Sequence, residues 1–327
     1  MTIQWSEFSD IIHANQSFVL TSHIRPDCDA LGSELAMAEI LTKLGKDVRV
    51  VNGQPTPPSL TFIDPAGDIL VIHEDLEPSD LVDVDVVMVL DTSAWAQLGP
   101  MGEVMRTTNA KKVILDHHVS SDDLGAVEFK DSSAEATGRL VIDAAEALNV
   151  PLTKKMATPL FSAIATDTGW FRFPSTTDGT YEAVAKLVRA GARPAEIYSE
   201  LYERDTMGRI KLRGLSLSRI ESELDGALAH TYVLKEDFER TGALPSDTED
   251  LVNQALAIAG TQMALIFIGQ LKGGFKVSFR SRCKVDCSEM SSRFGGGGHR
   301  AAAGAFVKGE FPEVRKLVLD AVREAMR

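Results

Sequence analysis

Four short apolar runs constrain the fold of this chain more than any other feature. They are almost continuous in Val, Ile and Leu, and they cover residues 17–23, 47–52, 84–91 and 111–118. A strand with one face in solvent alternates polar and apolar residues, whereas a strand covered on both faces does not. Helical patterns lie between and after the runs, at 30–44, 132–148 and 153–166. The pattern predicts an α/β fold with a parallel sheet and helices on both faces.

The pattern changes in the last third of the chain. We expect a first domain over residues 1–203, a connecting helix or linker over 204–224, and a smaller α+β domain over 225–327. Two domains also agree with the length of 327 residues, since about 150 residues per domain is usual. In the second domain, Ser246 and Glu249 predict a capping box that opens a helix.

Charge and cysteine content limit which binding partners and which cellular compartment we expect for the protein. The net charge of −13 argues against binding of long double-stranded nucleic acid, which needs an extended basic surface. Residues 272–300, however, hold seven Lys or Arg and two acidic residues, so this segment alone is positive. Three unpatterned cysteines, a polar start and no apolar stretch of membrane-spanning length predict a cytoplasmic protein without membrane contact.

Acidic and histidine side chains gather where the apolar runs end. They are His23, Asp27 and Asp29 after the first run, Asp91 at the end of the third, Asp116, His117 and His118 at the end of the fourth, and Asp167 after the 153–166 helix. Ligands of open α/β sheets bind outside the carboxyl ends of the strands, so we expect these side chains on one rim. One such aspartate is usually a turn former or a helix cap, but four on one rim favour a metal centre.

Four carboxylates in a partly desolvated cleft require positive charge. The set is Asp27, Asp29, Asp91 and Asp167, and Arg25 is the only base in the same motifs. Two divalent cations would neutralise the set, with His23 and His117 completing the ligands. Oxygen and imidazole ligands without thiolate favour Mn²⁺ or Mg²⁺. The Asp27–Asp29 spacing predicts two carboxylates on the same side of an extended segment, one for each cation, and Asp91 is placed to bridge them.

The segments that carry these residues resemble the motifs of the DHH phosphoesterase superfamily. The motifs are SHIRPDCDALGS, LDTS, LDHH and ATDTG, while KVSFRS and FGGGGHRAAAG are similar to the DHH-associated C-terminal domain. The resemblance runs from Ser22 to Gly304, and the compact length and tail resemble the NrnA-type bifunctional oligoribonucleases and pAp phosphatases. One departure is Cys28, at a position usually filled by Gly or Ala.

The resemblance implies a role for each residue at the site. His23, Asp27 and Asp91 would hold one Mn²⁺, and Asp29, Asp91, His117 and Asp167 would hold the other, with Mg²⁺ or Co²⁺ as alternatives. His118 would face the scissile phosphate, and Asp116 would either orient an imidazole or cap local backbone. Substrate would be held across a cleft between the domains by Arg280, Gly296, Gly297, Gly298 and His299.

The implied activity is that of a Mn²⁺-dependent phosphohydrolase in which two metals activate water. Its substrates would be very short RNA, degraded to nucleoside monophosphates, and 3′-phosphoadenosine 5′-phosphate (pAp), dephosphorylated to AMP. The alternatives are a linear or cyclic dinucleotide phosphodiesterase, a pyrophosphatase or exopolyphosphatase, and a non-catalytic nucleotide-binding module. Homodimerisation stays open.

Overall fold

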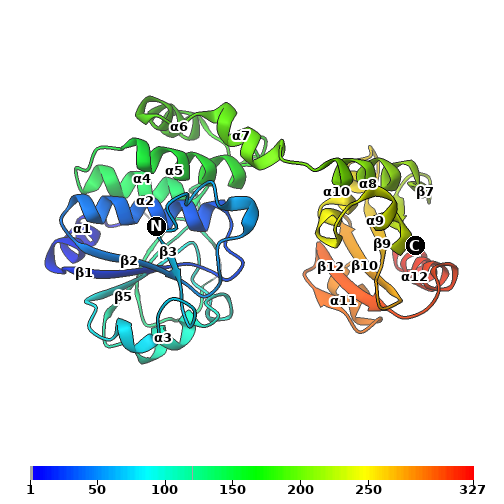
Figure 1. The fold of residues 1–327 in the computed structure, drawn as a ribbon, viewed down its shortest axis with the longest axis horizontal. Coiled ribbons are helices and arrows are strands. Elements are labelled where there is room, and N and C mark those ends of the chain that lie inside the picture. The colour runs from blue at the N-terminus through cyan, green and yellow to red at the C-terminus, as the bar shows by residue number, and fades with distance from the viewer. Residues whose placement is uncertain (1–2, 120) are drawn as a thin grey trace. The chain divides into compact units, whose positions relative to one another are not determined.

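The chain divides into two compact units, Met1–Glu203 and Arg204–Arg327. We describe a computed structural model that covers residues 3–119 and 121–327. Each unit is built on its own six-stranded sheet, and each is described by itself (Figure 1).

The sheet of the first unit is parallel throughout, as the apolar runs predict. Its strands are β1 (Ser17–Thr21), β2 (Asp47–Asn52), β3 (Ile69–Val71), β4 (Val86–Leu90), β5 (Lys111–Asp116) and β6 (Val127–Lys130). They lie in the order β3-β2-β1-β4-β5-β6, and every pairing between neighbours is parallel. The direction of strand succession reverses between β1 and β4. In doubly wound sheets this reversal is the point where ligands bind.

Both faces of this sheet are covered, which explains why its strands do not alternate polar and apolar residues. Phe18 and Leu20 of β1 face a core shared with the helices α1 (Trp5–Ala14), α2 (Cys28–Lys43), α4 (Thr137–Ala147) and α5 (Lys154–Asp167). Val19 faces the opposite core, with Met101 and Met105 of α3 (Met101–Thr107). The helices α6 (Asp178–Ala190) and α7 (Pro194–Tyr202) lie against α5 (Figure 1). Short 3₁₀ helices occupy Pro58–Leu60, Pro78–Leu81 and Trp95–Gln97.

The second unit has a mixed sheet covered by helices, in agreement with an α+β domain. Its strands are β7 (Glu221–Glu223), β8 (Leu228–Val233), β9 (Met263–Gly269), β10 (Phe275–Ser281), β11 (Gly297–Gly298) and β12 (Ala302–Val307), in the order β11-β12-β10-β9-β8-β7. Only β8 and β9 pair in parallel among these described strands. The helices are α8 (Met207–Ser218), α9 (Lys235–Thr241), α10 (Leu251–Leu256), α11 (Cys287–Ser292) and α12 (Phe311–Met326).

Two details of this unit differ from the sequence expectation. Residues 204–224, expected to connect the domains, contribute α8 and β7 to the second unit. The capping box of Ser246 and Glu249 is wrong, because Asp247 accepts a hydrogen bond from the Leu244 backbone N–H and closes a 3₁₀ turn over Pro245–Thr248 instead. Asp250 then adopts a φ of 63°, so α10 begins only at Leu251.

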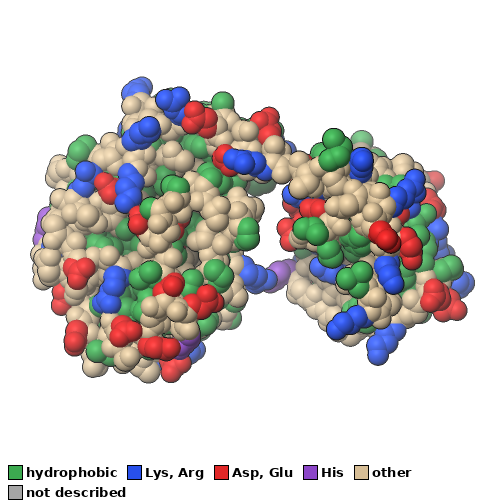
Figure 2. Space-filling view, in the orientation of Figure 1, with side chains coloured by type: hydrophobic (Ala, Val, Ile, Leu, Met, Phe, Trp, Pro, Cys, Tyr) green, Lys and Arg blue, Asp and Glu red, His purple; other side chains and the backbone are tan. Residues whose placement is uncertain are grey.

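The face of the first unit that Figure 2 shows carries side chains of both charges, with acidic and basic groups interspersed. Within the described residues, no helix combines the length and the apolar character that crossing a membrane requires.

Candidate metal centre

The predicted acidic and histidine residues gather at the carboxyl ends of β1, β4 and β5. His23 follows β1, Asp91 directly follows β4, and His117 directly follows β5. These ends flank the reversal of strand order between β1 and β4, where three neighbouring strands deliver their loops to one place.

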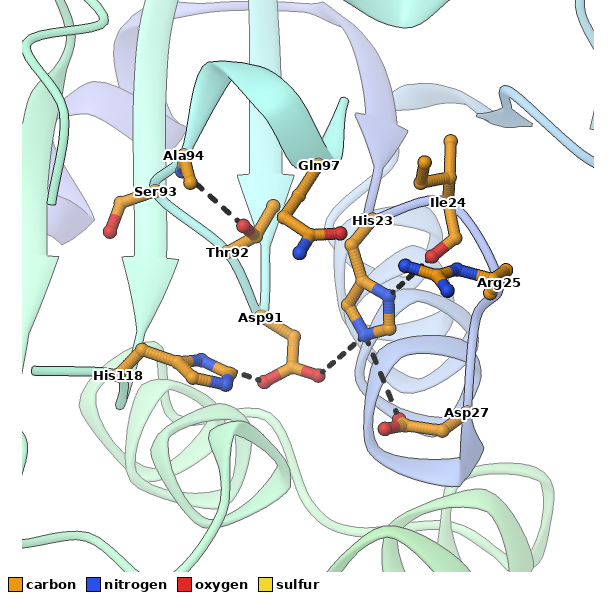
Figure 3. Close-up of a pocket in the computed structure, with 10 residues that line it drawn as sticks. All are labelled: His23, Ile24, Arg25, Asp27, Asp91, Thr92, Ser93, Ala94, Gln97 and His118. Carbon is orange, nitrogen blue, oxygen red and sulfur yellow. Dashed lines mark hydrogen bonds and ion pairs between the residues drawn. The ribbon is translucent and has the colours of Figure 1, made fainter. Parts of the chain in front are cut away.

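One group of potential ligands comprises His23, Asp27 and Asp91. The Nε2 atom of His23 lies 3.4 Å from Oδ2 of Asp91 and 3.9 Å from Oδ1 of Asp27 (Figure 3). The other ring nitrogen lies 3.0 Å from the carbonyl oxygen of Ile24, so Nε2 is the atom that faces the carboxylates. One ligand atom from each residue lies within 4.8 Å of the other two, which is a separation that a single cation can span.

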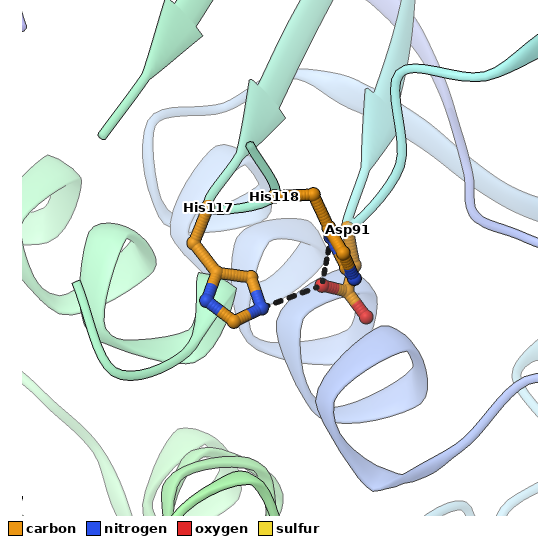
Figure 4. Close-up of side chains that lie close together, drawn as sticks. All are labelled: Asp91, His117 and His118. Atoms are coloured by element: carbon orange, nitrogen blue, oxygen red, sulfur yellow. Dashed lines mark ion pairs between the residues drawn. The ribbon is translucent and has the colours of Figure 1, made fainter. Parts of the chain in front are cut away.

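A second group comprises Asp29, His117 and Asp167. The Nε2 atom of His117 lies 3.2 Å from Asp167, 3.7 Å from Asp29 and 3.7 Å from Oδ1 of Asp91. Figure 4 shows Asp91 reaching toward His117 and His118. Asp91 therefore presents Oδ2 to His23 of the first group and Oδ1 to His117 of the second, so it lies between the two groups.

The conformation expected for Asp27 and Asp29 is wrong. Helix α2 begins at Cys28, so the two aspartates do not share an extended segment. Asp27 is its N-cap and accepts hydrogen bonds from the backbone N–H groups of Asp29 and Ala30, because the first N–H groups of a helix lack partners within it. Asp29 lies in the first turn and is fully buried, whereas the side chain of Asp27 is 59% exposed.

Asp29 is held by residues that the sequence analysis did not single out. The backbone N–H groups of Thr137 and Gly138, at the start of α4, donate to its carboxylate at 2.7 and 2.8 Å. The Thr137 hydroxyl donates to Oδ1 of Asp91 at 2.8 Å. A helix N-terminus attracts anions, but the predicted helix began at residue 132, so no signal in the sequence indicated that Thr137 and Gly138 would supply these N–H groups.

The electrostatics of the centre are those of a site that needs cations. Burial, followed by the charge of Asp167, raises the pKa of Asp29 to about 6. Burial and the charge of Asp29 raise the pKa of Asp91 well above its ordinary value. Burial lowers the pKa of the His117 imidazole, but the surrounding aspartates outweigh this and raise it to about 10. Burial and the proximity of like charges thus both disfavour the ionised carboxylates, and nearby divalent cations would offset this.

The donor set fits hard divalent cations. It consists of carboxylate oxygens and imidazole nitrogens, the ligands that Mn²⁺ and Mg²⁺ accept. Cys28, beside Asp27, belongs to none of the groups of potential ligands, and burial raises the pKa of its thiol to about 12.

Asp116 orients His118 and also caps local backbone, so both expected roles occur together. Its Oδ1 accepts from the backbone N–H of His118 at 3.0 Å and lies 2.8 Å from the Nδ1 atom. Oδ2 accepts from the Ser93 hydroxyl at 2.7 Å and lies 3.1 Å from the Lys130 ammonium, two partners that the sequence analysis missed. Burial raises the pKa of Asp116, but these hydrogen bonds outweigh it and lower the pKa to about 2.

The five predicted substrate residues belong to the second unit. Arg280 lies on β10 and is partly buried. Its guanidinium donates a hydrogen bond to the carbonyl oxygen of Phe279 at 3.0 Å. A Cβ at Gly296 or Gly298 would lie within 3 Å of the β12 backbone, so the close approach of these strands already requires glycine at both positions. Gly297 and His299 are exposed, and a Cβ at Gly297 would meet open space.

Comparisons with known proteins identify relatives along nearly the whole chain. A relative from Thermus thermophilus, the bifunctional oligoribonuclease and PAP phosphatase NrnA, is 32% identical over 94% of this chain and 89% of its own. The protein of the same name from Bacillus subtilis is 26% identical over 92% of this chain and 93% of its own. The crystal structure of an exopolyphosphatase-related protein from Bacteroides fragilis, 25% identical, matches 98% of this chain and 95% of that chain with a TM-score of 0.86.

The family models match the same two regions that the motifs indicate. Residues 17–164 match the N-terminal domain of the DHH family, and residues 226–327 match the DHHA1 domain. The resemblance seen in the sequence is thereby confirmed: the chain belongs to the DHH phosphoesterase family.

Proposed function

We propose that this protein is a Mn²⁺-dependent phosphohydrolase that degrades very short RNA to nucleoside monophosphates and converts pAp to AMP. The observation that carries the proposal is the pair of ligand groups that Asp91 connects, as a member of the first and through the 3.7 Å separation of its Oδ1 from His117 in the second. The names of two curated relatives, from Thermus thermophilus and Bacillus subtilis, support the choice of substrates.

Each residue of the centre has a task in this proposal. His23, Asp27 and Asp91 hold one cation, and Asp29, Asp91, His117 and Asp167 hold the other. When bound, two such cations lower the pKa of water and stabilise charge on phosphoryl oxygens. Thr137 and Gly138 keep Asp29 and Asp91 in place through their hydrogen bonds.

His118 is the residue that meets the phosphate. Its Nδ1 atom is directed to Asp116, so that in the protonated imidazolium form Nε2 donates a hydrogen bond to a phosphoryl oxygen. The side chain is half exposed and lines a pocket of about 450 Å³ together with His23, Asp27 and Asp91. This hydrogen bond strengthens as charge builds on the phosphoryl oxygens in the transition state.

The net charge of the protein supports a preference for short substrates. A net charge of −13 provides little attraction for a long polyanion, so each added nucleotide contributes little binding energy. Arg280, Gly296, Gly297, Gly298 and His299 supply a local grip on the substrate, with the arginine fork suited to a phosphate.

The test compares initial rates on several phosphate compounds. The purified protein is incubated with Mn²⁺ and, separately, pAp, a labelled RNA dinucleotide, a 24-nucleotide RNA, pyrophosphate and a cyclic dinucleotide. We expect the highest kcat/KM on pAp and the RNA dinucleotide. If pyrophosphate were hydrolysed faster than pAp and the RNA dinucleotide, the protein would be a pyrophosphatase instead. If the cyclic dinucleotide were hydrolysed fastest, it would be a cyclic-dinucleotide phosphodiesterase.

A further inference from the structure

The loop between β1 and α2 holds Arg25 in an unusual backbone conformation. Its φ is 57°, in the left-handed region that few residues other than Gly, Asn and Asp adopt. The Arg25 N–H donates to Oε1 of Gln54 at 2.7 Å, and the N–H of neighbouring Ile24 donates to the carbonyl of Gln97 at 2.7 Å. The loop is therefore tied to two other segments, which stabilise this conformation of Arg25.

The side chain of Arg25 faces the same pocket as the metal ligands. It lines the pocket of about 450 Å³ with His23, Asp91 and His118 (Figure 3). Among residues 3–119 and 121–327, no acidic side chain lies within ion-pair distance of Arg25, and no hydrogen bond of its guanidinium is formed. Asp27, two residues away in the same pocket wall, is directed toward His23 instead.

The guanidinium of Arg25 therefore lies beside the metal centre without an acidic partner among the described residues. Once divalent cations neutralise the carboxylates, Arg25 gives this side of the pocket a net attraction for a second anionic group. Thr92 and Gln97 add a hydroxyl and an amide to the same wall. The pocket volume is in the range of small-molecule sites.

The two proposed substrates, pAp and a 5′-phosphorylated dinucleotide, both carry a 5′-phosphate that Arg25 could bind. Hydrolysis of pAp, and of a 5′-phosphorylated dinucleotide, breaks the bond between phosphorus and the 3′-oxygen, while the oxygen of water joins phosphorus. In both cases the leaving group is a nucleoside 5′-monophosphate. Its 5′-phosphate does not react, and a guanidinium beside the metal centre is suited to bind it.

We propose that Arg25 binds the non-reacting 5′-phosphate of the leaving nucleotide and so selects substrates that carry one. The inference rests on the proposed function. A guanidinium fork forms two hydrogen bonds to a phosphate, which a hydrated ammonium or a neutral side chain does not reproduce.

Two substitutions at Arg25 distinguish the contribution of its side chain from that of its backbone conformation. Arg25→Gly removes the guanidinium and leaves the positive φ unstrained, whereas Arg25→Lys retains the charge without the fork. We expect Arg25→Gly to lower kcat/KM for pAp about ten- to hundredfold, with an intermediate effect of Arg25→Lys. For 3′-AMP, which lacks the 5′-phosphate, kcat/KM should change less than twofold. Equal losses on pAp and 3′-AMP would overturn the assignment.

Equilibrium binding tests Arg25 independently of turnover. Titration calorimetry measures the affinities of the Mn²⁺-loaded wild type and Arg25→Gly for AMP and adenosine. The wild type should prefer AMP, and Arg25→Gly should lose that preference; an unchanged preference would refute the proposal. Arg193→Ala, which removes an exposed arginine paired with Glu196 on α7, serves as the matched control. A wild type inactive on pAp and RNA would refute the proposed function, while the binding comparison would still decide the role of Arg25.

Discussion

The carboxylate of Asp29 accepts a hydrogen bond of 2.8 Å from the backbone N–H of Gly138, a residue 109 positions later in the chain. Helix α4 approaches so closely here that only glycine fits. A Cβ at Gly138 would lie 2.8 Å from the Cβ of Ala163 and 3.3 Å from Oδ1 of Asp29. The metal centre therefore depends on the packing of α4 against α2 and α5.

Gly138→Ala should damage both stability and metal binding. The added methyl group pushes α4 away from Asp29, at a cost of about 1–3 kcal/mol in the free energy of unfolding. We expect the Mn²⁺ affinity, measured by calorimetry, to fall about ten- to hundredfold. Gly214→Ala is the control, because a Cβ at Gly214 in α8 meets nothing within 4 Å and should stabilise the helix by about 0.5–1 kcal/mol. Unchanged Mn²⁺ affinity in Gly138→Ala would contradict this account of Asp29.

Asp91→Asn should abolish hydrolysis without unfolding the protein. Asp91 has a φ of 61°, which asparagine tolerates better than alanine, and the hydrogen bond from Thr137 can be retained. Because burial and Asp29 raise the pKa of Asp91, removal of its charge should not lower the melting temperature of the metal-free protein at pH 7. Calorimetry should show loss of Mn²⁺ binding. Wild-type turnover of pAp by this variant would refute the role assigned to Asp91.

Asp116→Asn should slow turnover while leaving metal binding intact. The Asp116 carboxylate contacts the backbone N–H and the imidazole of His118 but belongs to none of the three groups of potential ligands, of which the third is Asp91, His117 and His118. With the carboxylate removed, the imidazole loses the charged acceptor that sets its orientation. We expect kcat to fall about ten- to hundredfold and the Mn²⁺ affinity to change less than twofold. A loss of metal affinity as large as that of Asp91→Asn would place Asp116 among the ligands instead.

Arg280→Ala should mainly raise KM. The substitution removes a guanidinium that we propose to contact substrate, and it leaves every proposed metal ligand in place. We expect KM for pAp to rise about tenfold with kcat largely retained. Arg282→Ala, at an exposed position two residues along the chain, should leave both constants unchanged. Similar effects of the two substitutions would indicate a general charge effect of this basic segment.

Glu223→Gln should reduce stability at neutral pH but not in strong acid. Glu223 accepts hydrogen bonds from Arg323 at 2.6 and 2.8 Å and lies 3.0 Å from Nε2 of buried His230. The Arg323 guanidinium is the main cause that lowers the pKa of Glu223 to about 2. Since this folded-state pKa lies below the unfolded value, the stabilisation is complete above about pH 4.5 and is lost as the pH falls toward 2.

Urea unfolding of the wild type and Glu223→Gln across this range measures the effect. The difference in unfolding free energy should shrink steadily from pH 5 to pH 2. A difference that does not vary with pH would mean that Glu223 stabilises the unit through packing instead of charge.

The central strands could be predicted because burial on both faces leaves a strong sequence signal. The expected strand 47–52 coincides with β2, and the ends of β1, β4 and β5 lie next to the predicted polar residues. The edge strands β3 and β6 have three and four residues, too few for a recognisable pattern. Parallel strands deliver their carboxyl ends to one edge, which is why ligands from distant segments could be grouped without a structure.

Helix boundaries and the support around the ligands could not be predicted in the same way. The expected helix over 132–148 begins only at Thr137, and the first N–H groups of that helix are the ones that bind Asp29. Ser93 and Lys130 meet Asp116 from separate elements, and no local pattern brings them together. Contacts of this kind arise from tertiary packing, which propensity and periodicity do not encode.

The anchoring of Asp29 by the backbone of α4 has a consequence for residues outside the centre. The carboxylate is oriented by two main-chain N–H groups, and their position is set by the contacts of α4 with α2 and α5. Side chains on these three helices can therefore tune the affinity of the centre without ever meeting an ion.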